Sequence, residues 1–344
     1  MMSIRNLYNR FMNVSIDETT NENIDQRMDV LDETFTITDE ITMHENDNTV
    51  ENMSNYIMDL SVNGYTVIPN VYSEEEIKEY WSEFNKWRES VPDLEHTHNI
   101  LSSAGIFKHH QVGHQRFAWL ARTNPKIVNI FKQLWDTDKL VTSFDGCCYY
   151  PENYAEEPSY WTHTDQSSQK KGLRGYQSFL SLTNNTERTF VVYKGSHLLH
   201  ENYFKYMEID DPKDWNIIDR DYIDTIYYKQ EIISVKAGDL VIWDSRTFHQ
   251  NTCGDPDCGE ERLVQYLCYL PKNHPDNDSN QMGLRMTYFN TLRTTNHLPY
   301  PMCAVSKQPN TYNYYNPAYP IVINYKNLPK PELTDMLLRI YELL

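Results

Sequence analysis

The sequence lacks clusters of basic residues and long apolar runs. Its 31 lysines and arginines are outnumbered by 49 aspartates and glutamates, which gives a formal charge of −18. Because nucleic acids and anionic membrane surfaces are held by clustered lysine and arginine, we expect neither as a partner. No stretch approaches the roughly 18 consecutive apolar residues of a membrane span, so we expect no membrane-spanning segment.

The sequence also lacks a disulfide framework, because six cysteines without regular spacing are few for 344 residues. Cys268 lies in an apolar run, where a small buried hydrophobic residue is the usual interpretation. We therefore expect a reducing, cytoplasmic setting. Cys253 and Cys258 closely follow His249. A structural zinc site made by these three remains an alternative, although no fourth ligand is evident nearby.

Much of the negative charge lies near the N-terminus. Residues 1–50 contain eleven acidic residues and three arginines, and they mix asparagine and threonine with isolated apolar residues. This composition is typical of a weakly ordered segment. We therefore expect an acidic extension over residues 1–51 and one folded domain over residues 52–344. A content of 40% hydrophobic and 13% aromatic residues is ample for its core.

Helix signals lie on both sides of the region where strands are expected. Ser73, with Glu76 three residues later, forms a capping box before aromatic residues at helical spacing. Asn124 followed by Pro125 predicts the start of a second helix. A final helix is expected from about Pro331. Its predicted buried residues are Leu333, Leu337, Leu338 and Tyr341.

The most informative motif is His163-Thr164-Asp165 together with the distant His249. The aromatic and β-branched residues 159–162 favour a strand before the triplet, and residues two apart on a strand share a face. His249 closely follows a turn and an apolar run, residues 238–244, that predicts a buried strand. Two imidazoles and one carboxylate are the facial ligand set of non-haem Fe(II), which leaves coordination positions open. The motif therefore predicts a catalytic metal site.

Arg262 opens the next apolar run, residues 262–270, with a planar guanidinium suited to a carboxylate. A second His-x-Asp triplet, His274 to Asp276, contains a proline and continues into a polar turn, so we reject it as the ligand pair. His96 and His98 lie in a polar stretch that we interpret as a solvated loop. The order of triplet, distant histidine and arginine is more specific than any one of these motifs.

These residues resemble the phytanoyl-CoA dioxygenase-like family of Fe(II)- and 2-oxoglutarate-dependent oxygenases. Residues 63–71 followed by an acidic helix look like the family's opening strand and helix, and residues 194–197 look like its turn after the central strands. Ala237-Gly238-Asp239, before the strand that leads to His249, also fits. The resemblance covers roughly residues 52–300.

The resemblance implies a mainly β fold with flanking helices, a double-stranded β-helix or cupin-like jelly roll. It implies that His163, Asp165 and His249 bind Fe(II). It also implies that 2-oxoglutarate chelates the iron and pairs its far carboxylate with Arg262, so that O₂ and the cosubstrate support hydroxylation of a C–H bond with succinate as a coproduct. Halogenases of related type lack the carboxylate ligand. The further residues expected at the cosubstrate are Lys108, Gln177 and Asn251.

A long insert, about residues 198–230, lies where a lid over the metal belongs. Its aromatic residues suit a substrate wall, although packing against the barrel explains them equally well; they are Trp215, Tyr222, Tyr227 and Tyr228. Arg293, His297 and the tyrosine-rich residues 312–315 are candidates for the opposite side. Since few lysines cluster anywhere, we expect a small-molecule substrate instead of a phosphate-rich thioester.

Two other classes of function are compatible with the sequence. One is a metal-binding jelly roll, an isomerase, hydrolase or ligand-binding protein, that does not use 2-oxoglutarate. The other is a non-catalytic interaction protein that recruits partners through its acidic extension. The first predicts no dependence on Arg262, and the second predicts no tight Fe(II) site.

Overall fold

The computed structural model describes residues 47–95, 97, 104–305 and 323–344. Most of the predicted acidic extension lies outside the described residues, as do His96, His98 and residues 312–315. The helices are α2 (Asp47–Asn63), α3 (Glu74–Ser90), α5 (Arg116–Arg122), α6 (Pro125–Trp135), α7 (His200–Tyr206), α8 (Arg220–Thr225), α9 (Ser279–Asn290) and α10 (Leu337–Glu342). None of the described helices is long and apolar enough to cross a membrane.

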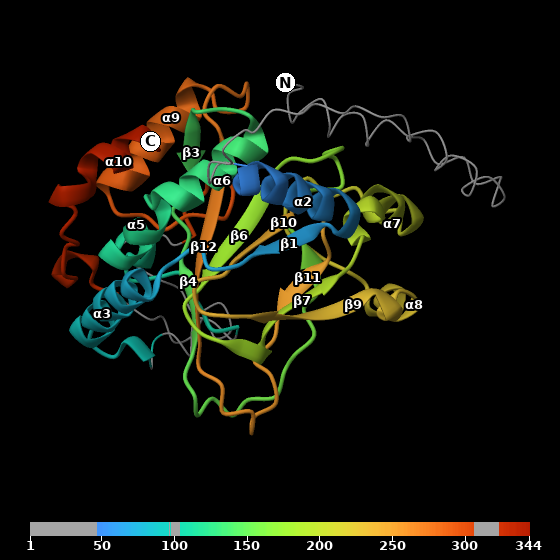
Figure 1. The fold of residues 1–344 in the computed structure, drawn as a ribbon, viewed down its shortest axis with the longest axis horizontal. Coiled ribbons are helices and arrows are strands. Elements are labelled where there is room, and N and C mark those ends of the chain that lie inside the picture. The colour runs from blue at the N-terminus through green and yellow to red at the C-terminus, as the bar shows by residue number, and fades with distance from the viewer. Residues whose placement is uncertain (1–46, 96, 98–103, 306–322) are drawn as a thin grey trace, which may run out of the picture.

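The strands form two antiparallel sheets (Figure 1). The larger sheet has the order β1-β10-β6-β12-β4-β2, with β3 paired to β12, and the smaller has the order β8-β5-β11-β7-β9. The bounds are β1 (Tyr65–Ile68), β2 (Ile106–Phe107), β3 (Leu140–Thr142), β4 (Cys147–Tyr150), β5 (His163–Thr164), β6 (Tyr176–Ser181), β7 (Asn185–Tyr193), β8 (Asn216–Ile217), β9 (Gln230–Val235), β10 (Leu240–Asp244), β11 (His249–Asn251) and β12 (Arg262–Pro271). The predicted mainly β jelly roll with flanking helices is confirmed.

The alternation of side chains along the strands divides the core into two layers. On β10, Leu240 and Ile242 pack with the helices, whereas Val241 and Trp243 pack between the two sheets. Successive strand residues face opposite sides, so β10, which is covered on both faces, is apolar from Leu240 to Trp243. Figure 1 shows α3, α5 and α6 grouped on one side of this sheet.

The same alternation points two polar residues of the larger sheet toward the space between the sheets. Arg262 shares a face of β12 with Val264 and Tyr266, and Gln177 shares a face of β6 with Phe179. Both side chains are almost fully buried. Strand period and sheet pairing therefore bring a guanidinium and an amide into the interior of the jelly roll.

Both helix starts predicted from capping signals are confirmed. Ser73 caps α3 with a complete capping box, and the Asn124 side chain accepts hydrogen bonds from the first turn of α6. From α3, Tyr80 and Phe84 pack on Phe117 of α5, with ring centroids 5.3 and 5.4 Å apart. Burying each such side chain contributes about 1.5–3 kcal/mol, which fixes the helical layer against the sheet.

The buried face predicted for the C-terminal helix is partly wrong. Leu338 is 84% exposed and Tyr341 is 53% exposed, whereas Met336 and Ile340 are buried. A 3-10 turn over Thr334–Met336 precedes α10. This turn delays the start of the helix and changes its phase, so that Ile340 faces the cluster formed with Trp119 and Phe144.

The insert between β7 and β9 is folded. It contains α7, the short strand β8 and α8, and β8 pairs with β5 through His163 and Ile217. Tyr203, Ile223 and Phe248 are members of one buried cluster that joins the insert to the barrel. Its position beside β5 places part of the insert next to the predicted metal ligands.

Candidate metal centre

The smaller sheet brings the three predicted metal ligands together. His163 on β5 is directly opposite His249 on the adjacent strand β11. The Nε2 atoms of His163 and His249 lie 3.5 and 3.4 Å from the same oxygen, Oδ2 of Asp165. Within the part of the chain that the structure describes, this is the one group of histidine, cysteine, aspartate or glutamate side chains arranged to hold a metal ion.

The strand expected over residues 159–162 is not formed, since β5 contains only two residues. The backbone N–H of Trp161 and the hydroxyl of Thr162 donate instead to Oε1 of Gln250, at 3.0 and 2.8 Å. A side-chain amide therefore replaces the strand ladder at this point. The ligand pair follows an irregular segment that is nevertheless tied to β11.

Backbone carbonyls orient both imidazoles toward the centre. Nδ1 of His163 lies 3.1 Å from the Trp161 carbonyl oxygen, and Nδ1 of His249 lies 2.8 Å from that of Thr247. With Nδ1–H donating to these carbonyls, each Nε2 presents its lone pair to the site. The Trp161 ring also stacks on His163, with an interplanar angle of 15°. The ligands are held in a binding orientation by the protein itself.

The site favours the protonation states that metal binding needs. Burial alone would raise the pKa of Asp165, but the adjacent imidazoles of His163 and His249 hold it well below its ordinary value. Burial, helped by the nearby His163, lowers the pKa of His249. A carboxylate and a neutral imidazole are the ligating forms of these groups.

Close packing at Gly64 positions the loop that carries His249. Thr247 donates through its hydroxyl to the Gly64 carbonyl at 2.9 Å, and the Phe248 N–H donates to the Ser196 hydroxyl at 2.8 Å. Gly64 has a φ of +81°, and a Cβ atom there would lie 2.5 Å from Nδ1 of His197 and 2.7 Å from the Thr247 hydroxyl. Only glycine fits this turn without displacing the loop.

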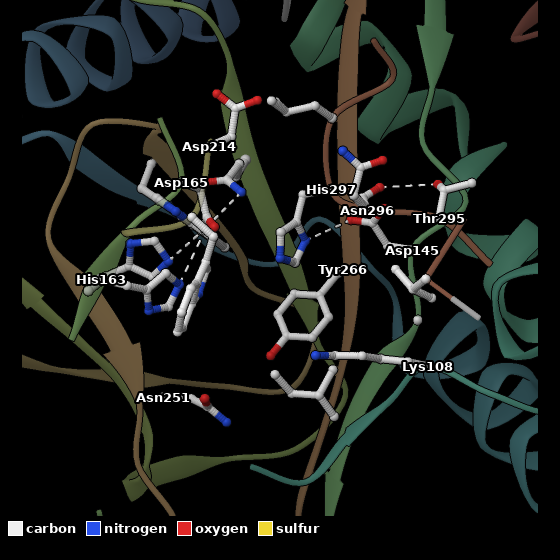
Figure 2. Close-up of a pocket in the computed structure, with 18 of the residues that line it drawn as sticks. Lys108, Asp145, His163, Asp165, Asp214, Asn251, Tyr266, Thr295, Asn296 and His297 are labelled. Carbon is white, nitrogen blue, oxygen red and sulfur yellow. Dashed lines mark hydrogen bonds and ion pairs between the residues drawn. The ribbon is translucent and has the colours of Figure 1, made fainter. Parts of the chain in front are cut away.

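A cavity of about 260 Å³ opens beside the three ligands. All four residues predicted to contact a cosubstrate line it, namely Lys108, Gln177, Asn251 and Arg262. Figure 2 labels two of them, Lys108 and Asn251, and shows His163 and Asp165 on one side of the cavity and His297 and Lys108 on another. The volume suits small molecules better than a large macromolecular segment.

Arg262 has hydrogen-bonding capacity to spare inside this cavity. Its side chain is buried, and Nη1 donates to the Sγ atom of Cys148 at 2.9 Å. Nε and Nη2 have no hydrogen-bond partner among the described residues. An uncompensated buried guanidinium is costly, so this geometry fits an anionic ligand that accepts from the planar fork.

Gln177 contacts a metal ligand, which the sequence did not indicate. Its Nε2 donates to Oδ2 of Asp165 at 3.0 Å, while its Oε1 has no partner among the described residues. Asn251 donates to the Ala104 carbonyl at 3.2 Å, and its Oδ1 is likewise without a described partner. Gln177 therefore orients the carboxylate ligand, and Asn251 retains an acceptor at the cavity.

Replacing Gln177 with alanine should weaken metal binding about 10- to 100-fold, because the Asp165 carboxylate loses the amide that orients it. Competition against a chelating dye measures the affinity. Gln169→Ala is a matched control, since Gln169 donates to Asp210 at 2.9 Å in an exposed pair. Equal affinity of wild type and Gln177→Ala would contradict this role.

Several other polar and cysteine residues near the motifs fall outside the site. Arg246 forms a buried pair with Asp244, with Nη2 and Oδ2 2.7 Å apart, so it orients Asp244 and does not line the cavity. His274 and Asp276 form a partly exposed pair in a turn, as expected from the rejected triplet. Cys253 and Cys258 are free cysteines and are not part of the metal-ligand group, so the zinc alternative is not supported.

His297, a candidate from the sequence, lines the cavity, and the structure adds Asp145, which the sequence did not single out. Asp145 lines the cavity and lies 3.2 Å from Nδ1 of His297. No sequence signal marks this pair, because its members are 152 positions apart. Of the four aromatic residues suggested as a substrate wall, only Trp215 lines the cavity, where its ring lies 5.6 Å from that of His163. Tyr222 packs on Tyr203 instead.

A jelly roll with an open two-histidine, one-carboxylate centre defines the class of this protein, and comparison with known proteins places it further. The model of the phytanoyl-CoA dioxygenase (PhyH) family matches residues 60–252. The chain belongs to this family.

Individual proteins that resemble this chain share 30% sequence identity or less with it. The "Ava biosynthesis cluster protein O" of Aspergillus versicolor is 30% identical over 219 residues, which are 57% of this chain and 67% of that protein. Among solved structures, the non-haem alpha-ketoglutarate-dependent epimerase SnoN from nogalamycin biosynthesis is 20% identical, with a TM-score of 0.46 over 64% of this chain and 84% of that chain. HygX from Streptomyces hygroscopicus, solved with nickel and 2-oxoglutarate, is 12% identical, with a TM-score of 0.45 over 64% and 87% of the two chains.

Proposed function

We propose that this protein is a non-haem Fe(II)- and 2-oxoglutarate-dependent dioxygenase that hydroxylates a C–H bond of a small molecule, with succinate and CO₂ as coproducts. The observation that carries the proposal is the presence in one cavity of a facial His163, Asp165 and His249 set and the buried guanidinium of Arg262. Membership of the phytanoyl-CoA dioxygenase family supports the same reaction class.

The donor set fits Fe(II). Two imidazole nitrogens and one carboxylate occupy one face of an octahedron and leave the other positions for exchangeable ligands. The ligating atoms of His163, Asp165 and His249 all lie within 4.8 Å of one another. A closed tetrahedral set of four protein ligands would instead indicate a structural zinc site.

The remaining polar groups fit 2-oxoglutarate. The free Nε and Nη2 donors of Arg262 suit its far carboxylate, because they lie in the same cavity as the proposed metal ligands. When bound, iron, 2-oxoglutarate and O₂ together supply the oxidant that removes hydrogen from the substrate. Asp165 occupies the position that halogenases leave free for a halide, which favours hydroxylation.

The protein's own residues bind the cosubstrate, orient the proposed metal ligands and shield the centre from water. Trp161 and Trp215 place apolar rings against His163 and exclude water from that side of the centre. Arg262 and Gln177 act from the larger sheet, the first on the cosubstrate carboxylate and the second on Asp165. Fixed donors on rigid strands hold the reacting groups in place without rearrangement.

The decisive test is an anaerobic titration of the apoprotein with Fe(II) and 2-oxoglutarate. We expect the weak visible charge-transfer band of the chelate to appear only when both are present, and to saturate at one equivalent of iron. Wild-type protein that binds Fe(II) but never develops the band would favour a jelly-roll metalloprotein that does not use 2-oxoglutarate. Absence of tight Fe(II) binding would favour a non-catalytic protein.

A further inference from the structure

The cavity contains a second polar group that the proposed cosubstrate does not require. Asp145 and His297 form a pair with Nδ1 and Oδ2 3.2 Å apart. Asp145 is 2% exposed, whereas the His297 side chain is 38% exposed. Both residues line the cavity. With Nδ1 held by Asp145, the ring of His297 points toward the space in front of the metal ligands (Figure 2).

The pair is held rigidly. The segment that precedes His297 exchanges two hydrogen bonds with Phe144, since the Phe144 N–H donates to the Thr295 hydroxyl and the Thr295 N–H donates to the Phe144 carbonyl, both at 3.0 Å. The Gly113 N–H donates to the Thr294 hydroxyl at 3.1 Å. Such preorganisation is characteristic of a recognition group, because little conformational entropy is lost on binding.

The formal charges in the cavity indicate which ligand suits the Asp145–His297 pair. Asp214 is paired with Lys170 at 2.7 Å, and Asp165 faces the two metal-binding histidines. On the proposed function, the charges of Fe(II) and Arg262 offset those of Asp165 and dianionic 2-oxoglutarate. Lys108 then remains near His297, and Asp165 is the carboxylate that acts on its charge.

The electrostatics of His297 agree with this picture. Burial disfavours the charged ring, but the hydrogen bond to Asp145 and the charges of Asp165 and Asp145 outweigh burial and raise the pKa of His297. The imidazolium presents Nε2–H as a donor, and nearby Lys108 is a second cation whose charge opposes protonation of the ring. Two cationic donors that share one cavity are both stabilised by one anion.

We infer that Lys108 and the Asp145-held His297 form the anchor for a carboxylate of the primary substrate, a small organic monoanion with an apolar or aromatic body. This inference rests on the proposed function, because it assigns Arg262 to the cosubstrate. Trp161, Trp215 and Leu298 supply the apolar walls of the same cavity. The inference assigns Lys108 to the substrate and not, as the family resemblance implied, to the cosubstrate.

The test measures discrimination between a carboxylate and an uncharged probe of equal length. Protein loaded with Zn²⁺ and saturating 2-oxoglutarate is titrated with benzoate, phenylacetate and 3-phenylpropionate, and with the corresponding alcohols, by calorimetry. We expect wild type to prefer at least one acid over its alcohol by about tenfold to a hundredfold. The preference should fall to near unity in Lys108→Met, return in Lys108→Arg, and decrease several-fold in His297→Phe.

The controls separate this inference from the proposed function. His274→Ala removes a histidine paired with Asp276 outside the cavity, and it should keep the wild-type preference. The visible band of Fe(II) and 2-oxoglutarate should persist in Lys108→Met and His297→Phe. Loss of that band in either variant would place the residue at the cosubstrate and overturn the inference, while the proposed function stands. Wild type that does not discriminate, including one that binds neither probe, would overturn it as well.

Discussion

Asp165→Ala should abolish iron binding and cosubstrate turnover together, lowering succinate production at least about a thousandfold. The carboxylate is the anionic ligand of the centre, and both Nε2 atoms point at its Oδ2. Its removal leaves two neutral imidazoles on the metal, and losing several kcal/mol of metal-centred stabilisation corresponds to about three powers of ten in rate. The measurement is succinate formation under air together with anaerobic appearance of the visible band.

The second His-x-Asp triplet provides a matched control for this experiment. Asp276→Ala removes a carboxylate 3.7 Å from His274 in an exposed turn, and it should leave both the band and turnover unchanged. Thermal unfolding in a chelator shows whether the Asp165→Ala protein is still folded. A folded Asp165→Ala protein that keeps the band would refute the assignment of the ligands, and equal loss in Asp276→Ala would mean that the wrong triplet was chosen.

Arg262→Ala should bind iron normally and lose 2-oxoglutarate. The guanidinium is 1% exposed, and its free Nε and Nη2 donors are the groups best placed for a far carboxylate. Removing one side of a buried charge-assisted pair costs roughly 3–5 kcal/mol, so the KM for 2-oxoglutarate should rise by two orders of magnitude or more. Steady-state kinetics and titration of the visible band both measure this.

Lysine should rescue Arg262 only partly, because an ammonium cannot donate two parallel hydrogen bonds from a planar fork. The control is Arg220→Gln. Arg220 is an exposed arginine on the insert, and its guanidinium lies over the Tyr160 ring. An unchanged KM in Arg262→Ala would contradict the cosubstrate role. That result would favour a metal-binding jelly roll that works without 2-oxoglutarate.

The convergence of His163, Asp165 and His249 was predictable because each half of the motif can be recognised from neighbouring residues. His163 and Asp165 are two residues apart, and His249 follows a strand whose apolar run can be read directly. The environment of the ligands was not predictable to the same degree. Gln177 was expected near the cosubstrate, yet its amide donates to Asp165. The pairing of β6 with β10 and β12 sets where Gln177 lies relative to Asp165.

Two predictions of local structure were wrong, each for an identifiable physical reason. The expected strand before His163 is absent because the side chain of Gln250, from a distant part of the sequence, binds the backbone there. The C-terminal helix buries Ile340 and exposes Leu338, because a 3-10 turn changes its phase by an amount that helical periodicity does not reveal. The first error arises where a tertiary contact overrides a local preference, and the second where a local 3-10 turn shifts the phase of the helix.

The family resemblance carried by the motifs implied the jelly roll, and local patterns in the sequence determined the capped helices α3 and α6 and the order of His163, Asp165, His249 and Arg262. These features depend on strand and helix period, which neighbouring residues specify. Only the tertiary structure decided that Asp145 meets His297, that Gln177 orients Asp165, and that Trp215 alone of the insert's suggested aromatic residues reaches the cavity. Those contacts join different strands and loops, and their geometry is set by sheet pairing and packing, which no short stretch of sequence encodes.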